Sequence, residues 1–218
     1  IKTPSTLKIA VSTDLGCLEV DQEVADIIHA AGEVFAGLGA SVTPDAPDLT
    51  GAMDVFQVQR AAGLRPLGDS LEKNFPAWRL DAKDTAIWNI EKGAQLSADD
   101  IMQAEATRSK IYARAVEFFQ HYDVLILPAA QVPPFAASEE WVKQINGVKM
   151  QTYLDWMAVC CMITVTGLPA ISVPAGFTKS GLPVGLQIVG RPRGDLALLQ
   201  IAQLFEDATR HYETAPAL

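Results

Sequence analysis

The chain has 218 residues, of which 49% are hydrophobic and 20% charged, and its 15 Gly and 13 Pro fall between apolar stretches rather than in tracts. This composition excludes disordered and fibrous proteins and is typical of a globular, soluble chain with one large domain or two small ones. With 26 acidic against 17 basic residues, the net charge is -9, which repels polyanions and argues against nucleic acid as a partner.

The first fifty residues are predicted to form a strand, a helix and a second strand. Leu7 to Ser12 alternates apolar and polar residues, as half-buried strands do. From Asp21, which suits an N-cap, apolar residues recur at three- and four-residue spacing until Gly37 and Gly39 close the helix. Residues of β type return over 40–43, so the natural interpretation is a parallel βαβ unit.

Two helical patterns follow, near residues 53–62 and 82–91. Pro66, Gly68 and Pro76 lie between them and predict an interruption, because proline and glycine disfavour a helix interior. We expect both segments to be helical excursions over a sheet.

A longer helix is predicted from Ser97, which forms a capping box with Asp100. Apolar residues then continue on one face for about six turns. They are Ile101, Ala104, Ile111, Ala115, Phe118 and Phe119. The helix leads into residues 123–128, a short continuous apolar run that predicts a strand buried on both faces of a central sheet.

The C-terminal third is predicted to contain two hairpins and a helix. Asn146-Gly147, between two short runs of β type, is a strong signal for a two-residue hairpin turn. The β-rich runs 170–177 and 184–190 are predicted to pair antiparallel, and Pro174 indicates a bulge or a sheet edge. Asp195 is predicted to cap the last helix.

The longest apolar run, around Met157 to Val165, is too short to span a membrane, which takes about 20 residues. No membrane partner is therefore expected. Three Cys, two of them adjacent at Cys160 and Cys161, cannot form a disulfide framework, which indicates a reducing compartment with the cytoplasm as the default. A Cys in an apolar segment normally behaves as a small buried hydrophobe, so we favour burial over a nucleophilic role for this pair.

The sequence contains no complete catalytic motif of a familiar kind. No Ser has the glycines of G-x-S-x-G, which argues against an α/β-hydrolase. Ser70 and Lys73 form S-x-x-K, but its companion motifs are absent and we favour a chance match. His29, His121 and His211 lie far apart and belong to no metal-ligand spacing, so we expect neither a metal nor another cofactor.

One long segment resembles a known family. Residues 167–190 read GLPAISVPAGFTKSGLPVGLQIVG and resemble the C-terminal segment of the amidase-signature enzymes, serine amidohydrolases that cut carbon-nitrogen amide bonds. DVLILP at 123–128, NIEKG at 89–93 and LKIAVS at 7–12 resemble other parts of the family in the right order. The resemblance covers essentially the entire chain and implies an α/β fold with a mixed, largely parallel sheet flanked by helices.

The family's chemistry uses a Lys, a bridging Ser and a nucleophilic Ser in a Gly/Ser-rich segment, all in the first half of its sequence. This chain has no such segment and begins at Ile1 rather than Met, so we expect a piece missing upstream. The resemblance implies that residues 1–218 are a single α/β region, the C-terminal half of an amidase without its catalytic N-terminal half. No catalytic residue is expected here, and the isolated chain is predicted to be inactive.

The expected partners are a small-molecule amide substrate and the missing N-terminal half. In the family, the segment before GLP contributes side chains to the substrate pocket, and the corresponding positions are Met157, Cys160 and Thr164. Phe56 is a further substrate-binding candidate from an earlier helical segment. Thr164 replaces an Asn often found there. Core packing is the competing interpretation for all four residues.

Two other functions remain open. The chain could be a noncatalytic binding or assembly module that keeps the scaffold, and the reading frame upstream of Ile1 would separate this from the enzyme. It could also be the A subunit of a tRNA-dependent amidotransferase, but those proteins have an Asp where Met157 stands, and the net charge is unfavourable for binding RNA. If the chain is half of an amidase, the apolar face against which the missing half would pack is exposed and predicts self-association, with a homo-oligomer as one form.

Overall fold

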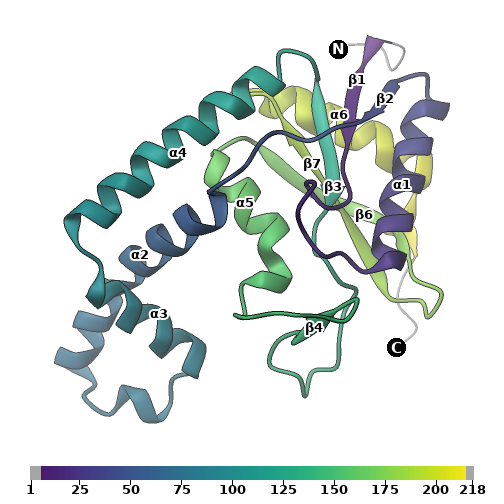
Figure 1. The fold of residues 1–218 in the computed structure, drawn as a ribbon. Helices are drawn as coiled ribbons and strands as arrows, with labels where there is room; N and C mark the ends of the chain where they lie inside the picture. The colour runs from purple at the N-terminus through teal and green to yellow at the C-terminus, as the bar shows by residue number, and fades with distance from the viewer. Residues whose placement is uncertain (1–5, 215–218) are drawn as a thin grey trace.

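A five-stranded sheet forms the centre of the protein, whose computed structural model describes residues 6–214 (Figure 1). The strands lie in the order β2 (Ser41–Pro44), β1 (Lys8–Val11), β3 (Val124–Pro128), β7 (Pro183–Gly190) and β6 (Ala170–Phe177). β1 pairs in parallel with β2 and β3, whereas β7 is antiparallel to both β3 and β6. Only β7 therefore runs against the other four, so the sheet is mixed and largely parallel, as the resemblance implied.

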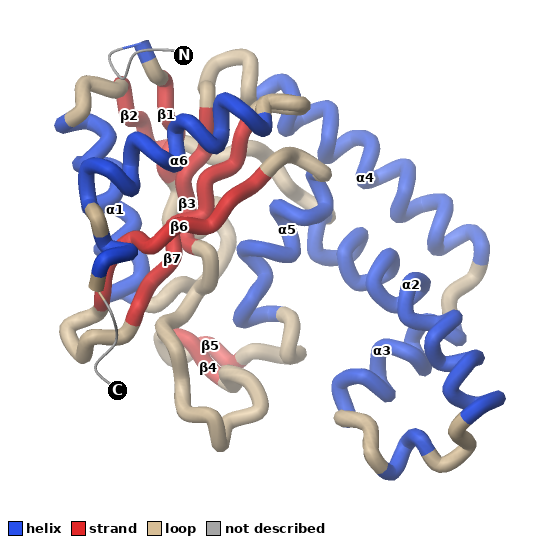
Figure 2. Tube along the Cα trace, turned by 180° about the vertical axis from the view of Figure 1, so that it is seen from behind, coloured by secondary structure: helices blue, strands red, loops and turns tan. Residues whose placement is uncertain are grey.

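Helices flank this sheet on both faces (Figure 2). In chain order they are α1 (Gln22–Gly37), α2 (Ala52–Asn74), α3 (Asp84–Gln95), α4 (Ala98–Phe118), α5 (Ala158–Thr166) and α6 (Asp195–Thr209). A small hairpin of β4 (Gln144–Ile145) and β5 (Val148–Lys149) lies apart from the sheet, and single helical turns cover Trp78–Leu80, Asp155–Met157 and His211–Glu213. No helix of residues 6–214 has both the length and the apolar character needed to cross a bilayer.

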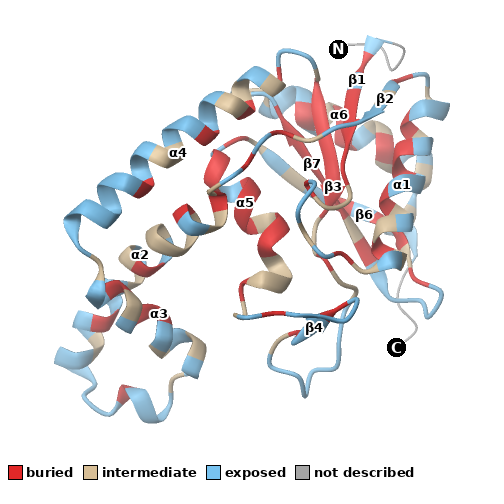
Figure 3. Cartoon of the chain, in the orientation of Figure 1, coloured by how far each residue is buried: buried red, intermediate tan, exposed pale blue. Residues whose placement is uncertain are grey.

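Two hydrophobic cores lie on opposite faces of the sheet, because successive side chains of a strand point to opposite sides. Ile9 and Ile126 point toward α1 and α6, where Phe35 and Phe205 stack with their ring centres 5.3 Å apart. Leu125 belongs to the other core, which contains residues from α4, α5 and the start of α2. The colouring by burial in Figure 3 shows the central strands β3 and β7 mostly buried between these layers, whereas the edge strand β2 is largely exposed and the edge strand β6 is partly exposed.

The predicted helix starts are confirmed for α1 and α4 and wrong in detail for α6. The Asp21 carboxylate accepts hydrogen bonds from two backbone N–H groups of the first turn of α1, and Ser97 and Asp100 form the complete capping box. In α6 the N-cap is Gly194, and Asp195 is the first helical residue. Its carboxylate makes no capping bond but suits the positive end of the helix dipole.

Helix α2 corrects two expectations. It continues through Pro66 to Asn74 instead of breaking there. It packs against α3, α4 and α5, and Figures 1 and 2 show its far half and α3 projecting away from the sheet rather than lying over it. The helix survives because Ala61 and Gly68, on either side of the proline, are both buried, and packing outweighs the hydrogen bond that a proline cannot donate.

The predicted hairpins are confirmed. Asn146 and Gly147 take positive φ values of 49° and 85°, as the two central residues of a tight hairpin turn require. β6 is an edge strand, and its pairing with β7 shifts register between Pro174 and Gly176. Pro174 therefore marks both a bulge and an edge.

On α4, Ile101 departs from the predicted apolar face: it is 39% exposed, whereas Ile111 is fully buried.

Candidate functional site

The uncovered side of helix α5 is the first feature of the candidate site. Seven of the nine residues of α5 are buried, which is unusual for so short a helix beside an open surface. The two that are not fully buried are Cys160 and Thr164, four residues apart and hence on one face. Met157, which precedes the helix, extends the same stripe by one turn and is half-buried. We call Met157, Cys160 and Thr164 the open stripe of α5.

The polar groups of the open stripe are turned back onto the chain itself. The Cys160 thiol donates to the Met157 carbonyl at 3.0 Å, and the Thr164 hydroxyl donates to the Cys160 carbonyl at 2.8 Å. A Thr or Cys that bonds its own helix in this way presents mainly its carbon and sulfur atoms outward. The stripe is therefore an apolar wall rather than a set of catalytic groups.

Phe56 is not part of this stripe. It lies on α2, is half-buried, and packs against the core cluster that contains Val159, Met162 and Ile163 from the buried side of α5. The structure thus brings together three of the four residues predicted to contact substrate and places Phe56 with the core. Because Phe56 is half-buried, both substrate contact and core packing stay open for it.

The two adjacent thiols differ sharply in their environment. Cys161 is buried, as predicted for both, whereas Cys160 is only half-buried. A hydrogen bond from the Cys161 thiol lowers the pKa of Cys160 to about 7, although partial burial opposes this. The same hydrogen bond, followed by burial, raises the pKa of Cys161, and the positive charge of Arg60 opposes that rise. Cys160 is therefore the thiol that ionises first.

A polar cluster beside the open stripe was not predicted from the sequence. The Tyr153 hydroxyl oxygen accepts hydrogen bonds from Arg60 Nε at 2.9 Å and from Asn89 Nδ2 at 2.6 Å. Arg60 comes from α2, Asn89 from α3, and Tyr153 lies four residues before Met157. Asn89 is only 2% exposed, so a buried side chain holds the Tyr153 hydroxyl in place. The one signal available in the sequence was the NIEKG match that begins at Asn89.

The S-x-x-K pair does not form a reactive centre. Ser70 and Lys73 lie at the exposed end of α2, and Ser70 accepts a hydrogen bond from the Asn74 side chain rather than from the lysine. Within residues 6–214 there is also no group of three or more His, Cys, Asp or Glu side chains that could hold a metal ion.

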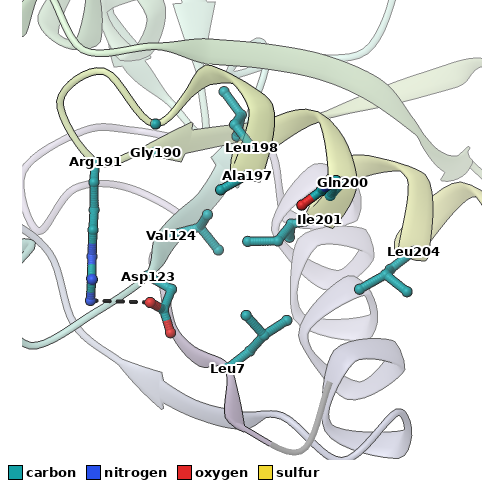
Figure 4. Close-up of a pocket in the computed structure, with 11 residues that line it drawn as sticks. Leu7, Asp123, Val124, Gly190, Arg191, Ala197, Leu198, Gln200, Ile201 and Leu204 are labelled. Atoms are coloured by element: carbon teal, nitrogen blue, oxygen red, sulfur yellow. Dashed lines mark ion pairs between the residues drawn. The ribbon is translucent and has the colours of Figure 1, made fainter. Parts of the chain in front are cut away.

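A hollow lies elsewhere in the described part of the chain, between α6 and the beginning of β3 (Figure 4). It has a volume of about 190 Å³ and a largely apolar floor that includes Leu198 and Ile201. At one end, Arg191 and Asp123 form an ion pair at 3.1 Å. The hollow is lined by no Ser, Thr, Cys, Lys or His side chain and by none of the predicted substrate-binding residues, so it is not the candidate site.

Comparison with known proteins gives a consistent result over nearly the whole chain. The sequence model of the family named Amidase matches residues 1–199. An acylamidase of Rhodococcus erythropolis is 30% identical over 97% of this chain, and the A subunit of a glutamyl-tRNA(Gln) amidotransferase of Dehalococcoides mccartyi is 38% identical over the same share. The match covers 44% and 47% of those two proteins, so the chain spans less than half the length of either.

Solved structures agree with this result. A bacterial aryl acylamidase of the amidase-signature family superposes with a TM-score of 0.85 and 26% identity, over 97% of this chain and 46% of that protein. A 6-aminohexanoate cyclic dimer hydrolase superposes with a TM-score of 0.78 over 95% of this chain, and at 22% identity it supports the fold alone.

Proposed function

The chain belongs to the amidase family, and on that premise we propose that it is the C-terminal half of an amidase, a hydrolase of carbon-nitrogen bonds other than peptide bonds. Residues 1–218 supply one α/β region of scaffold and the wall of the substrate pocket. The Ser-Ser-Lys centre that carries out hydrolysis belongs, in this proposal, to polypeptide upstream. Support comes from the match to under half of each relative and from the lack of a Gly/Ser-rich nucleophile segment in the printed sequence.

One observation carries the proposal further: α5 is buried except for the open stripe of Met157, Cys160 and Thr164. An apolar helix normally covers its hydrophobic face completely or leaves a broad polar face in water. A narrow uncovered stripe of Met, Cys and Thr suits the wall of an apolar pocket that the rest of the enzyme completes. We assign the acyl or amine portion of a small amide to this wall.

Other exposed apolar side chains support a further partner or self-association. Leu80 is 87% exposed, Phe75 66%, Leu196 70% and Met102 68%. Burial of such side chains is favourable by about 25 cal/mol for each Å² removed from water. We propose that part of this surface packs against the missing half, and that the isolated chain self-associates when that half is absent.

Amide hydrolysis tests the proposal directly. The purified chain, and the chain coexpressed with the polypeptide encoded upstream of Ile1, are each incubated with hexanamide and acetanilide, and ammonia or aniline is measured. We expect turnover only in the coexpressed pair, because loss of a whole nucleophile and base set removes nearly all acceleration. Turnover by the chain alone that persists in Cys160→Ala and in Ser70→Ala would refute the proposal.

The A subunit of a tRNA-dependent amidotransferase is retained as a second candidate because one such protein is 38% identical over 97% of the chain. Met157 weighs against it, since a thioether cannot neutralise the amino group of an amino-acid substrate. Glutamine hydrolysis stimulated by aminoacyl-tRNA in the coexpressed pair would favour this candidate. A native start codon at the beginning of the chain would instead favour the noncatalytic module.

A further inference from the structure

The cluster of Arg60, Asn89 and Tyr153 is built almost entirely of hydrogen-bond donors. A phenol oxygen has two acceptor positions and one proton. Arg60 and Asn89 occupy both acceptor positions of Tyr153, so the Tyr153 O–H can only donate outward. The guanidinium of Arg60 uses Nε in this contact, and its terminal nitrogens take part in no other hydrogen bond among the described residues.

Arg60 in the cluster and Lys92 beside it both lack a carboxylate partner among the described residues. Lys92 lies over the ring of Trp88, 4.9 Å from its centre, and the Trp88 and Tyr153 rings meet edge to face at 6.2 Å. Lys92 donates to the Gln57 side chain at 2.5 Å. Within residues 6–214, neither Lys92 nor Arg60 forms an ion pair, although six of the eight arginines of the chain do.

Cations without a carboxylate partner are unexpected in this chain, because its 26 acidic residues outnumber its 17 basic residues. A guanidinium held by a buried amide through a tyrosine is pre-organised, and its free N–H fork matches a carboxylate. The cluster borders the open stripe of α5, because α2, which carries Arg60, packs against α5, and Tyr153 lies in the turn four residues before Met157. A ligand lying along the stripe would therefore end at Arg60.

We infer that Arg60 and the Tyr153 hydroxyl bind a carboxylate on the amide substrate, remote from the bond that is cut. This inference rests on the proposed function and narrows it to amides that carry an anionic group. Asn89 is a positioning residue in this account, because it holds Tyr153 and does not touch the carboxylate. Lys92, which lies over the Trp88 ring, adds to the positive charge near the cluster.

Adipamate and hexanamide test the inference, since they differ only in a terminal carboxylate in place of a methyl group. Each is titrated into the ¹⁵N-labelled chain while the Arg60 Nε–H resonance is followed by NMR. We expect adipamate to shift this resonance and to bind about tenfold or more tightly than hexanamide, the gain typical of a charge-assisted pair. This comparison within the wild-type chain depends on no variant.

Two matched variants locate the effect. Arg60→Gln is expected to reduce the affinity for adipamate to that for hexanamide. Arg193→Gln, which removes the other arginine without an ion pair in the described part of the chain, is expected to leave it unchanged. Equal affinity for the two amides, or equal effects of the two variants, would overturn the inference. Acetate that binds as tightly as adipamate would reduce the site to a general anion site and would overturn it as well.

The two proposals can fail separately. Hydrolysis of neutral hexanamide by the coexpressed pair tests the amidase proposal and needs no carboxylate site. Binding of adipamate at Arg60 is measured on the chain alone and needs no turnover. Hydrolysis without carboxylate selectivity would leave the amidase proposal standing and remove this inference.

Discussion

Gly93 lies where α3 crosses α2, and replacing it with Ala should separate the two helices. A Cβ built at Gly93 would come within 2.2 Å of the carbonyl oxygen of Ala61 and 2.9 Å of its carbonyl carbon. Both are backbone atoms of α2, so no side chain can rotate away. Ordinary contact requires a retreat of more than about 1 Å, and overpacking of this kind costs about 1–3 kcal/mol.

The magnitude follows from two opposing contributions. In a helix interior Ala is favoured over Gly by about 1 kcal/mol. The contact with Ala61 offers no flexible neighbour, so we place its cost at or above the upper end of the overpacking range, which leaves a net loss of about 2 kcal/mol. For a chain of this size that loss lowers Tm by about 4–8 °C.

Two other glycines provide controls within the same pair of helices. Gly63 on α2 has nothing within 4 Å of a built Cβ, so Gly63→Ala should raise Tm through helix propensity alone. Gly68 would meet the Cγ2 methyl group of Ile90 at 2.2 Å. This side-chain atom can move by a χ1 rotation, which is costly for a β-branched residue in a helix but less so than moving the backbone, so Gly68→Ala should fall between the other two. Unfolding is followed by circular dichroism at 222 nm and by urea titration. Equal midpoints for Gly63→Ala and Gly93→Ala would refute the reasoning.

Two further predictions concern the core and the thiols. Phe205→Ala removes one ring of the stacked pair with Phe35, both fully buried, and should cost about 3–5 kcal/mol in urea unfolding; a loss below 1 kcal/mol would contradict the packing described. Iodoacetamide should label Cys160 fastest, with a rate that falls as pH decreases below about 7. The hydrogen bond with Cys160 raises the pKa of Cys161, and partial burial raises the pKa of Cys17, so both of these thiols should react slowly. Peptide mass spectrometry identifies the labelled thiol, and equal labelling of all three would contradict the assignment.

Most of the strands and helix starts follow from local sequence. The apolar run at 123–128 predicted a strand buried on both faces, and β3 is fully buried. Asn146-Gly147 and the Ser97 capping box predicted their turns correctly because each signal acts within four residues. Pro66 shows the limit of such signals: local preference predicts a break, but burial of Ala61 and Gly68 against α3 keeps the helix continuous.

The candidate site shows the same division. The match before GLP selected Met157, Cys160 and Thr164, and the structure shows that they share the uncovered side of α5 and of the turn before it. Phe56 was a candidate from the earlier helical segment, and the structure places it half-buried against the core cluster on the other side of α5. Which side of α2 meets α5 depends on packing between segments about a hundred residues apart, and no local periodicity contains that information.

The sequence by itself determined the family, the order of the elements and the lack of a Gly/Ser-rich nucleophile segment within the printed chain, because these depend on residue identity and short spacing. Only the tertiary structure decided that Arg60, Asn89 and Tyr153 meet at a single oxygen atom. They are separated by 29 and 64 residues along the chain, and they converge because α2, α3 and the segment before α5 pack together. Hydrogen bonds between residues so far apart along the chain require that hydrophobic burial hold the elements that carry them together.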